Sequence, residues 1–254
     1  MTTDFEEREP YVASVKGVLC THAPGVQIVD LSHDIPRGNV REAALFLVGA
    51  APYFPPGTIH IAAVASGARP IAVSICDQIV LCPDNGVITL LADGYALGDV
   101  RAITETIGHA ATDGQLYFAR DVFAPAAARL ACGGVLSELG PKVDAVTKLE
   151  LARPIRLDDR TIQGQIIHIN RFGSLVTNIH RSAIAGLNVV KIVAGAFPIG
   201  RLSTSYSDVA PGKPLALVGS SQYLEIAYNG DRADARLHLD VGIAVTVSFD
   251  PARV

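Results

Sequence analysis

Six short stretches of the sequence place polar side chains where turn residues meet apolar segments. They are residues 3–5, 30–36, 83–86, 118–121, 170–178 and 219–221. In α/β proteins the loops at strand ends hold ligands, and carboxylate, amide and hydroxyl groups there can bind the polar parts of a small molecule. Each stretch alone also has a structural interpretation: Asp121 fits a helix cap, and Asp84-Asn85-Gly86 is typical of a turn. The spacing of these residues therefore leaves the chemistry open.

Several common kinds of catalytic site are missing from the sequence. Its histidines and cysteines form no pair with metal-ligand spacing, so we predict no metal site. The sequence also has no GxGxxG, Walker A or GxSxG motif. A metal enzyme and a phosphate-loop enzyme are therefore disfavoured.

The composition limits the partners that the protein can have. The 254 residues are 49% hydrophobic and 18% charged, and the formal net charge of −4 comes without a cluster of lysines and arginines. This charge pattern argues against nucleic acid as a partner. No apolar run approaches the roughly 20 residues that a membrane span requires, so we expect no membrane partner. The N-terminus is acidic, unlike a signal peptide, and the sequence is typical of a soluble cytoplasmic protein.

The cysteines give no sign of a disulfide scaffold. Cys20, Cys76, Cys82 and Cys132 are scattered through apolar stretches and lack paired spacing. Because cysteine is among the residues most often buried, we predict that all of them are reduced core residues.

Helical and strand patterns alternate in the first half of the chain. Apolar residues at three-to-four spacing predict helices over residues 11–20, 40–48 and 121–132. Strands are predicted over residues 26–31, 58–64, 71–76 and 78–82. The last two of these strands flank a tight turn at Asp77. Because the strands are apolar on both faces, a buried and mostly parallel sheet is expected.

Strands with little helix between them follow after about Leu149. They are predicted over residues 162–169, 189–193, 215–218, 223–228 and 242–247. Residues 148–160 are charged and contain Pro154, as expected of a linker. The sequence therefore predicts an α/β protein with an N-terminal α/β domain at residues 1–152 and a smaller C-terminal β domain at residues 160–254.

Taken together, the polar stretches and their surroundings resemble one family. The motifs are Thr3-Asp4-Phe5, DLSHDIP at 30–36, FPPGTIH at 54–60, PDNGVIT at 83–89, ARDVFAPAAARLA at 119–131, NRFGSLVTNI at 170–179 and GSSQYLEIA at 219–227. Their order and their spread over nearly the whole chain are similar to those of the S-adenosyl-L-methionine (SAM) hydroxide adenosyltransferases, or SAM hydrolases, which are related to the fluorinase and chlorinase. The resemblance implies a C-terminal β-barrel domain and a homotrimer with SAM bound between neighbouring subunits.

The resemblance also implies a reaction, nucleophilic displacement at the 5′ carbon of SAM. Attack by water or hydroxide would give adenosine and L-methionine. The sulfonium leaves as a neutral thioether, so the leaving group needs no general acid, and SAM is the substrate of a reaction for which no cofactor is expected. The site must position SAM, exclude bulk water and hold one nucleophile in line with the carbon–sulfur bond.

Three residues near the N-terminus belong to the implied site. Asp4 would hold the ribose, because one carboxylate can accept hydrogen bonds from two vicinal hydroxyls. Glu9 and Tyr11 fall at family positions near the methionine moiety. Asp4 is only the fourth residue of the sequence, so most of the strand expected before it would lie upstream.

The second domain supplies the other implied contacts. Ser220 and Ser221 match positions that bind the methionine carboxylate. Phe172 matches a ring that stacks on adenine, and Ser174 matches an asparagine at the edge of the base. Gly230 would offer backbone groups to adenine.

The chain departs from the family pattern at the groups that handle charge. Asn170 stands where the family has a carboxylate that receives the methionine amine. The family hydrolases activate water with an aspartate, an arginine and a histidine. The corresponding stretches here are residues 65–70 and 118–121, which lack the aspartate and the histidine. Arg69 is therefore the remaining candidate for the catalytic arginine.

The second of these stretches leaves two alternative functions open. Phe118 and Ala119 would line the substrate site, and they are similar to the dry halide pocket of the family's halogenases. A halide-using relative is one alternative. A diverged protein that binds SAM or adenosine without turnover is the other, because the activating groups are missing. Arg120 and Asp121 are interpreted as a structural pair at a helix start.

Overall fold

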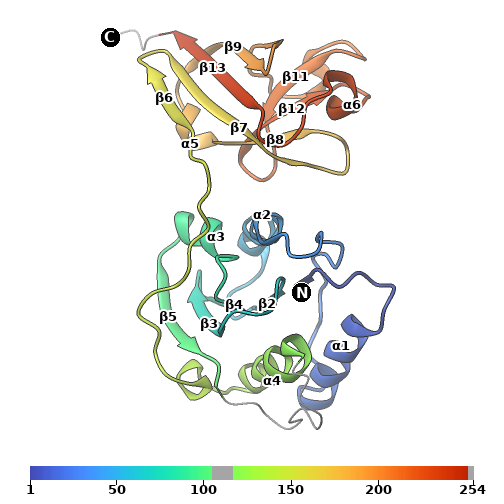
Figure 1. The fold of residues 1–254 in the computed structure, drawn as a ribbon, viewed down its shortest axis with the longest axis vertical. Helices are drawn as coiled ribbons and strands as arrows, with labels where there is room; N and C mark the ends of the chain where they lie inside the picture. The colour runs from blue at the N-terminus through green and yellow to red at the C-terminus, as the bar shows by residue number, and fades with distance from the viewer. Residues whose placement is uncertain (105–116, 251–254) are drawn as a thin grey trace. The chain divides into compact units, whose positions relative to one another are not determined.

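The computed structural model describes residues 1–104 and 117–250 of the chain. Contacts between Cα atoms divide the chain into two compact units, Met1–Leu149 and Glu150–Val254. Figure 1 shows helices and strands together in the first unit, and mostly strands in the second.

The first unit is built on a sheet with the strand order β1-β2-β4-β3-β5. The strands are β1 (Thr2–Thr3), β2 (Ile59–Ala63), β3 (Pro70–Ile75), β4 (Gln78–Pro83) and β5 (Leu97–Ala102). Strand β2 pairs in parallel with both β1 and β4, whereas β3 pairs antiparallel with β4 and β5. Strands β1, β2, β4 and β5 therefore run in one direction and β3 runs against them, which confirms the mostly parallel sheet.

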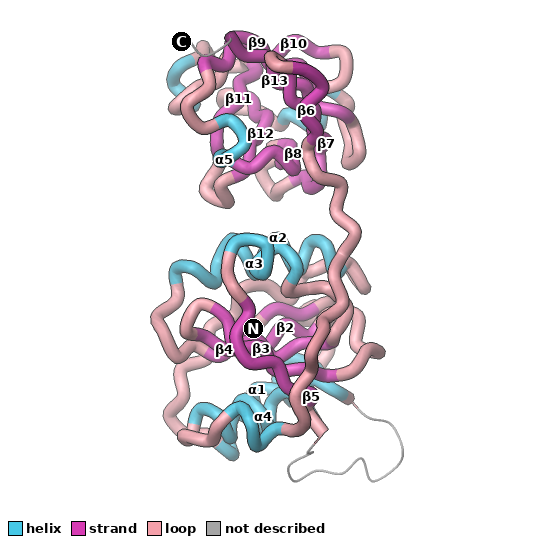
Figure 2. Tube along the Cα trace, turned by 90° about the vertical axis from the view of Figure 1, so that its left-hand side faces the viewer, coloured by secondary structure: helices cyan, strands magenta, loops and turns pink. Residues whose placement is uncertain are grey.

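Helices cover both faces of this sheet. Helices α1 (Tyr11–His22) and α4 (Ala124–Ala131) pack on one face, and α2 (Val40–Ala50) and α3 (Thr89–Gly94) pack on the other. Figures 1 and 2 show these helices as layers on either side of the strands. The predicted helices over residues 11–20 and 40–48 are confirmed, and a turn of π-helix, η2 (Ala119–Phe123), precedes α4.

The apolar character of the strands on both faces follows from these two layers. Along β2, Ile61 and Ala63 belong to the core beneath α1 and α4. The alternate residues Ala62 and Val64 belong to the core beneath α2 and α3. A strand whose successive side chains point to opposite faces needs apolar residues at every position when both faces are covered. Short 3-10 turns, η1 (Ala51–Tyr53) and η3 (Leu136–Leu139), complete the unit.

Two expectations about the first unit are wrong. Residues 26–31 do not form a strand; they run beside β1, where Ser32 makes an isolated bridge with Thr2. Strand β1 forms its ladder with β2, and on its other side it contributes only this single bridge. Cys82 is buried as predicted, but Cys20 and Cys132 are exposed because they lie on the outer side of α1 and at the end of α4.

The second unit is an antiparallel barrel whose strand order is β10-β9-β13-β7-β8-β12-β11, with β6 paired to β7. The strands are β6 (Ile155–Asp158), β7 (Thr161–Ile169), β8 (Leu175–His180), β9 (Asn188–Ala194), β10 (Phe197–Gly200), β11 (Pro214–Val218), β12 (Tyr223–Tyr228) and β13 (Ala244–Asp250). A bridge between Leu202 and Ala216 brings the two edges together, so the sheet is nearly closed around one apolar core. The barrel implied by the family resemblance is confirmed.

Short helical segments lie between the barrel strands. They are α5 (Arg181–Ile184), η4 (Tyr206–Asp208) and α6 (Ala233–Leu237). Strand β6 occupies residues inside the segment for which a linker is predicted, and it belongs to the second unit.

Within the described parts of the chain, residues 1–104 and 117–250, we find no helix that combines the length and the apolar character needed to cross a membrane.

Candidate functional site

The carboxyl ends of β1, β2 and β4 meet at one edge of the first sheet, because these strands are parallel. Asp4 follows β1 directly, and its Oδ2 accepts hydrogen bonds from Gly38 N (2.9 Å) and Ala65 N (3.2 Å). Ala65 follows β2 with φ of 52°, so the chain turns sharply beside the carboxylate. Asp4 Oδ1 has no hydrogen-bond partner within residues 1–104 and 117–250 and is therefore free to accept from a ligand.

Arg69 lies at the same edge, because β3 runs against its neighbours and begins just after it. Its Nη2 pairs with Asp84 Oδ2 at 2.6 Å, while Asp84 Oδ1 accepts a hydrogen bond from Thr147 N at 2.7 Å. The Arg69 side chain is 49% exposed, against 8% for Asp84. One side of the guanidinium is thus fixed and the other faces solvent.

An aromatic cluster of Phe5, Tyr11 and Tyr117 lies next to Asp4 in the chain and in space. The ring centroids of Tyr117 lie 5.4 Å from Phe5 and 5.6 Å from Tyr11. The Arg120 guanidinium lies over the Tyr117 ring at 5.6 Å. Burial raises the pKa of Tyr117, and the nearby Asp4 carboxylate also acts to raise it. Tyr11 was predicted for the site; Tyr117 was missed, although an aromatic residue directly before Phe118 could have suggested it.

Phe118 and Ala119 open the helical turn that leads into α4. Ala119 is fully buried in the core beneath α1 and α4, and Phe118 packs against the same core. The Arg120 Nε pairs with Asp121 Oδ1 at 2.6 Å, and Asp121 Oδ2 accepts a hydrogen bond from Tyr117 N at 2.8 Å. The structural pair predicted for Arg120 and Asp121 is confirmed. Ala119 therefore offers no exposed surface to a ligand in this structure.

In the second unit, Asn170 shapes the loop between β7 and β8. Its Oδ1 accepts hydrogen bonds from Phe172 N and Ser174 N, both at 3.0 Å. This turn leaves the Phe172 side chain 80% exposed, whereas Ser174 is buried. An exposed ring on a fixed loop is suited to stacking on a flat partner.

The same loop is attached to the turn that follows β12. Arg232 Nη1 donates to Arg171 O at 2.9 Å, and Asp234 N donates to Gly173 O at 3.0 Å. Gly173 has φ of 80°, and a Cβ there would overlap the Arg232 side chain. These contacts bring Phe172 and Ser174 close to the turn that contains Gly230, as the sequence-based site requires.

Ser220 and Ser221 form the tip of the hairpin between β11 and β12. Gly219 N donates to Tyr223 O at 2.9 Å and Gln222 N donates to Gly219 O at 3.0 Å, which closes the hairpin. This tip precedes β12, whereas the turn at Gly230 follows it. At about 3.3 Å per residue, the 6 residues of β12 separate the two groups by roughly 20 Å.

The predicted residues are thus divided between the two units. The first unit holds Asp4, Glu9, Tyr11, Arg69, Phe118 and Ala119, and the second holds Asn170, Phe172, Ser174, Ser220, Ser221 and Gly230. Glu9 is exposed just before α1. Most of these residues lie at strand ends or in loops, whereas Tyr11 begins helix α1 and Phe118 and Ala119 open the helical turn before α4.

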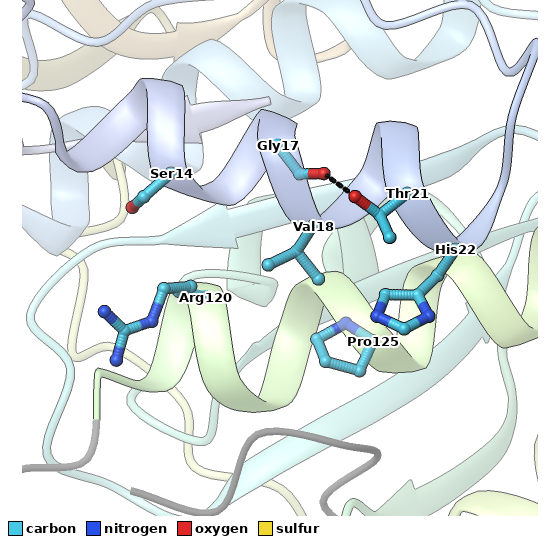
Figure 3. Close-up of a pocket in the computed structure, with 7 residues that line it drawn as sticks. All are labelled: Ser14, Gly17, Val18, Thr21, His22, Arg120 and Pro125. Atoms are coloured by element: carbon cyan, nitrogen blue, oxygen red, sulfur yellow. Dashed lines mark hydrogen bonds between the residues drawn. The ribbon is translucent and has the colours of Figure 1, made fainter. Parts of the chain in front are cut away.

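A cavity of about 230 Å³ lies elsewhere in the first unit, between α1 and the start of α4. Figure 3 shows Ser14 and His22 of α1 on one side and Arg120 and Pro125 on the other. None of the residues predicted for the site lines this cavity. Among residues 1–104 and 117–250, no group of three or more histidine, cysteine, aspartate or glutamate residues is placed to hold a metal ion.

Comparison with known proteins identifies relatives along the whole chain. The family model described as the SAM hydroxide adenosyltransferase N-terminal domain matches residues 1–140, and that of the C-terminal domain matches residues 164–246. A Thermus thermophilus protein named (R)-S-adenosyl-L-methionine hydrolase is 35% identical over 96% of each chain. A fluorinase of Actinoplanes sp. is 25% identical, over 97% of this chain and 95% of its own. The crystal structure of an uncharacterized conserved protein from Thermotoga maritima has a TM-score of 0.87 and 27% identity, covering 97% of this chain and 98% of that one.

Proposed function

Because the chain belongs to the SAM hydroxide adenosyltransferase family, we propose that it hydrolyses SAM to adenosine and L-methionine. The observation that carries the proposal is the 35% identity, over 96% of both chains, to a relative named as a SAM hydrolase. The match of family models to both units supports it. The name of this relative further favours the (R) configuration of the sulfonium.

The chemistry needs little acid or base catalysis. A water oxygen attacks the 5′ carbon of SAM, the carbon–sulfur bond breaks, and its electron pair stays on sulfur. The leaving group is the neutral thioether of methionine, and the proton lost by the attacking water passes to solvent. Catalysis then consists mainly of alignment and exclusion of competing water. We therefore propose a reaction without a metal or a cofactor, whose rate is unchanged by a chelator such as EDTA.

Asp4 is proposed to hold the ribose. Its Oδ2 is fixed by two backbone N–H groups from Gly38 and Ala65, so the carboxylate is oriented before the substrate arrives. The remaining oxygen can accept from the ribose hydroxyls. A charged acceptor makes stronger hydrogen bonds than a neutral one, which favours a carboxylate at this position.

The aromatic cluster beside Asp4 is proposed to face the sulfonium. Phe5, Tyr11 and Tyr117 offer ring faces and edges within a few ångströms of one another. A cation is attracted to the face of an aromatic ring, and apolar rings also exclude water from the reacting carbon. With Glu9 and Tyr11, this side of the first unit would hold the sulfur end of the methionine moiety.

Arg69 is proposed to orient the attacking water. A guanidinium stays protonated in proteins and therefore cannot act as a base. Its outward N–H groups can instead donate to the water oxygen, while the pair with Asp84 fixes its direction. Phe118 is proposed to border the water, with the buried Ala119 supporting it from the core.

The second unit is proposed to bind both ends of the substrate. Phe172, Ser174 and Gly230 would hold adenine, and Ser220 and Ser221 would hold the methionine carboxylate. The two groups lie at opposite ends of β12, roughly 20 Å apart along the strand. The assignment of the methionine amine to Asn170 stays a prediction.

The direct test is incubation of purified protein with each sulfonium epimer of SAM, followed by chromatography. We expect equal amounts of adenosine and methionine from the (R) epimer. For the Arg69→Ala variant, Arg101→Ala serves as a matched control, because Arg101 also pairs with an aspartate but lies within strand β5. Absence of adenosine above a protein-free control would overturn the hydrolase proposal.

The same incubations test the two alternative functions. Phe118 and Ala119 are apolar, and the chain is 25% identical to a fluorinase, so chloride and fluoride are added in separate samples. A 5′-halogenated nucleoside would identify a halide-using enzyme. Intact SAM that co-purifies with the protein after incubation would identify a binding protein without turnover.

We also propose that the protein is a cytoplasmic homotrimer with the substrate site between neighbouring subunits. The proposal rests on family membership, which the matches over residues 1–140 and 164–246 support. Light scattering coupled to size-exclusion chromatography should give three times the chain mass of 26.7 kDa. A monomeric mass with full activity would exclude a site shared between subunits.

A further inference from the structure

Glu225, in the middle of β12, carries a carboxyl group that the protein leaves unpaired. The residue is 8% exposed. It makes no hydrogen bond or ion pair with any residue in the ranges 1–104 and 117–250. Neither carboxyl oxygen of Glu225 is fully buried. The small exposed area of this residue therefore includes the carboxyl group itself.

The carboxyl group points along the outer side of the barrel toward the hairpin tip. Glu225 pairs with Leu217 across the β11–β12 ladder, and Gly219 lies two residues farther along β11 on the same face. A Cβ at Gly219 would overlap the Glu225 carboxyl group. The glycine therefore leaves the space into which this side chain extends, directly beside Ser220 and Ser221.

A carboxylate in this position is unfavourable for the folded protein alone. Burial raises the pKa of Glu225, because desolvation disfavours the charged carboxylate. Buried charges in proteins are normally paired, and an apolar residue would fill the same place at lower cost. A largely buried carboxylate whose oxygens still reach solvent is instead suited to a cationic group brought by a ligand.

The chemistry of an α-amino acid identifies that group. Its ammonium and carboxylate are bonded to the same carbon, so their binding groups must lie side by side. Ser220 and Ser221 offer hydroxyl donors at the hairpin tip, next to the Glu225 acceptor. Asn170 lies at the other end of β12, and its Oδ1 already accepts two backbone hydrogen bonds.

We propose that Glu225 accepts the α-ammonium of the methionine moiety while the Ser220–Ser221 tip donates to its carboxylate. This inference rests on the proposed function and deepens it, since it assigns the amino-acid end of the substrate to a single hairpin. Glu225 is then the residue that distinguishes an α-amino acid from an analogue that lacks the amine.

The test compares two unreactive thioether analogues of SAM by calorimetry. One is S-adenosyl-L-homocysteine, and the other has hydrogen in place of its α-amino group. Loss of one partner from a buried charged pair changes affinity by about 30-fold or more. We expect the wild type to bind the amine-bearing analogue more tightly by that factor. The dissociation constants of the two analogues for the Glu225→Gln variant should differ by no more than about threefold. Adenosine should bind equally to both proteins.

Two controls separate this inference from the proposed function and from misfolding. Glu150→Gln, at an exposed glutamate of the same unit, should keep the full preference. The melting temperature of Glu225→Gln should not fall, because the variant removes an unpaired charge. If the wild type cleaves SAM but Glu225→Gln still prefers the amine, the inference is wrong and the hydrolase proposal stands. If the wild type neither binds these nucleosides nor cleaves SAM, the proposed function itself fails.

Discussion

Asp4 in the first unit and Glu225 in the second are both carboxylates beside strands, but the protein surrounds them differently. Two backbone N–H groups, from Gly38 and Ala65, hold one oxygen of Asp4. Glu225 is more deeply buried and has no partner in the described ranges of the chain. A carboxylate held by the backbone is oriented for neutral hydroxyls, whereas one without compensation is suited to a cation. The surroundings of the two carboxylates therefore suggest different kinds of ligand group, hydroxyls at Asp4 and a cation at Glu225.

The largest effect is expected for Asp4→Ala. This change removes the ribose acceptor and also the acceptor for two loop N–H groups, so kcat/KM for SAM should fall by about 100-fold or more. Asp4→Asn keeps one acceptor oxygen for the loop N–H groups of Gly38 and Ala65, so its kcat/KM should fall less than that of Asp4→Ala. Steady-state kinetics with chromatographic detection of adenosine measures both variants. An Asp4→Ala enzyme with unchanged kcat/KM would remove Asp4 from the site.

A smaller effect is expected for Arg69→Ala. Loss of the guanidinium should lower kcat by about tenfold and leave KM nearly unchanged, because the group is proposed to orient water rather than SAM. Arg69→Lys should recover little of the rate, since an ammonium lacks the planar fork that pairs with Asp84. A rise in KM without any change in kcat would instead place Arg69 in substrate binding.

The hairpin of the second unit can be tested by Gly219→Ala. Its new methyl group should displace the Glu225 carboxyl group and lower the free energy of unfolding by about 1 kcal/mol. In the double variant with Glu225→Ala, the same methyl group meets no carboxyl, so this penalty should disappear. Urea denaturation of the wild type, both single variants and the double variant measures the coupling. Strictly additive effects would show that Gly219 and Glu225 do not contact each other.

The smallest effect is the pH dependence of stability in Glu225→Gln. Because burial raises the pKa of Glu225, the folded state binds this proton more tightly than the unfolded state. The stability that the bound proton contributes is fully present below the pKa of Glu225 in the unfolded state, about 4.5. It is lost as the pH rises through the higher pKa of the folded state. The glutamine variant should therefore gain stability relative to the wild type as the pH rises from 4 toward 7. A difference that does not change with pH in thermal scans would contradict the unpaired carboxylate.

The sequence predicts the framework well where the pattern of apolar residues depends on burial alone. Strand β2, apolar except for His60, predicts a sheet covered on both faces, and the alternation of Ile61 and Ala62 between two cores confirms it. The error at residues 26–31 has a different origin. A β-branched run forms a strand only where a neighbour pairs with it, and β1, which pairs with β2, offers residues 26–32 only the single bridge from Thr2 to Ser32.

The site could be predicted only through its motifs. Asp4, Phe172 and Ser220 occur in motifs that resemble the family, and their places within those motifs are the reason for predicting them. Glu225 belongs to the motif Tyr-Leu-Glu-Ile-Ala, in which a glutamate is typical of a solvent-facing position on an amphipathic strand. Its burial depends on the Gly219 hairpin that covers it, and such a contact across two strands leaves no periodic signal in the sequence.

The turn at Asn170 has a consequence for the rate and strength of ligand capture. Two hydrogen bonds to Asn170 Oδ1 and the attachment through Arg232 hold the Phe172 loop in one shape. The loop therefore loses its conformational entropy when the chain folds, not when a nucleoside docks. Such preorganisation lets nearly all of the stacking energy of the ring appear as affinity.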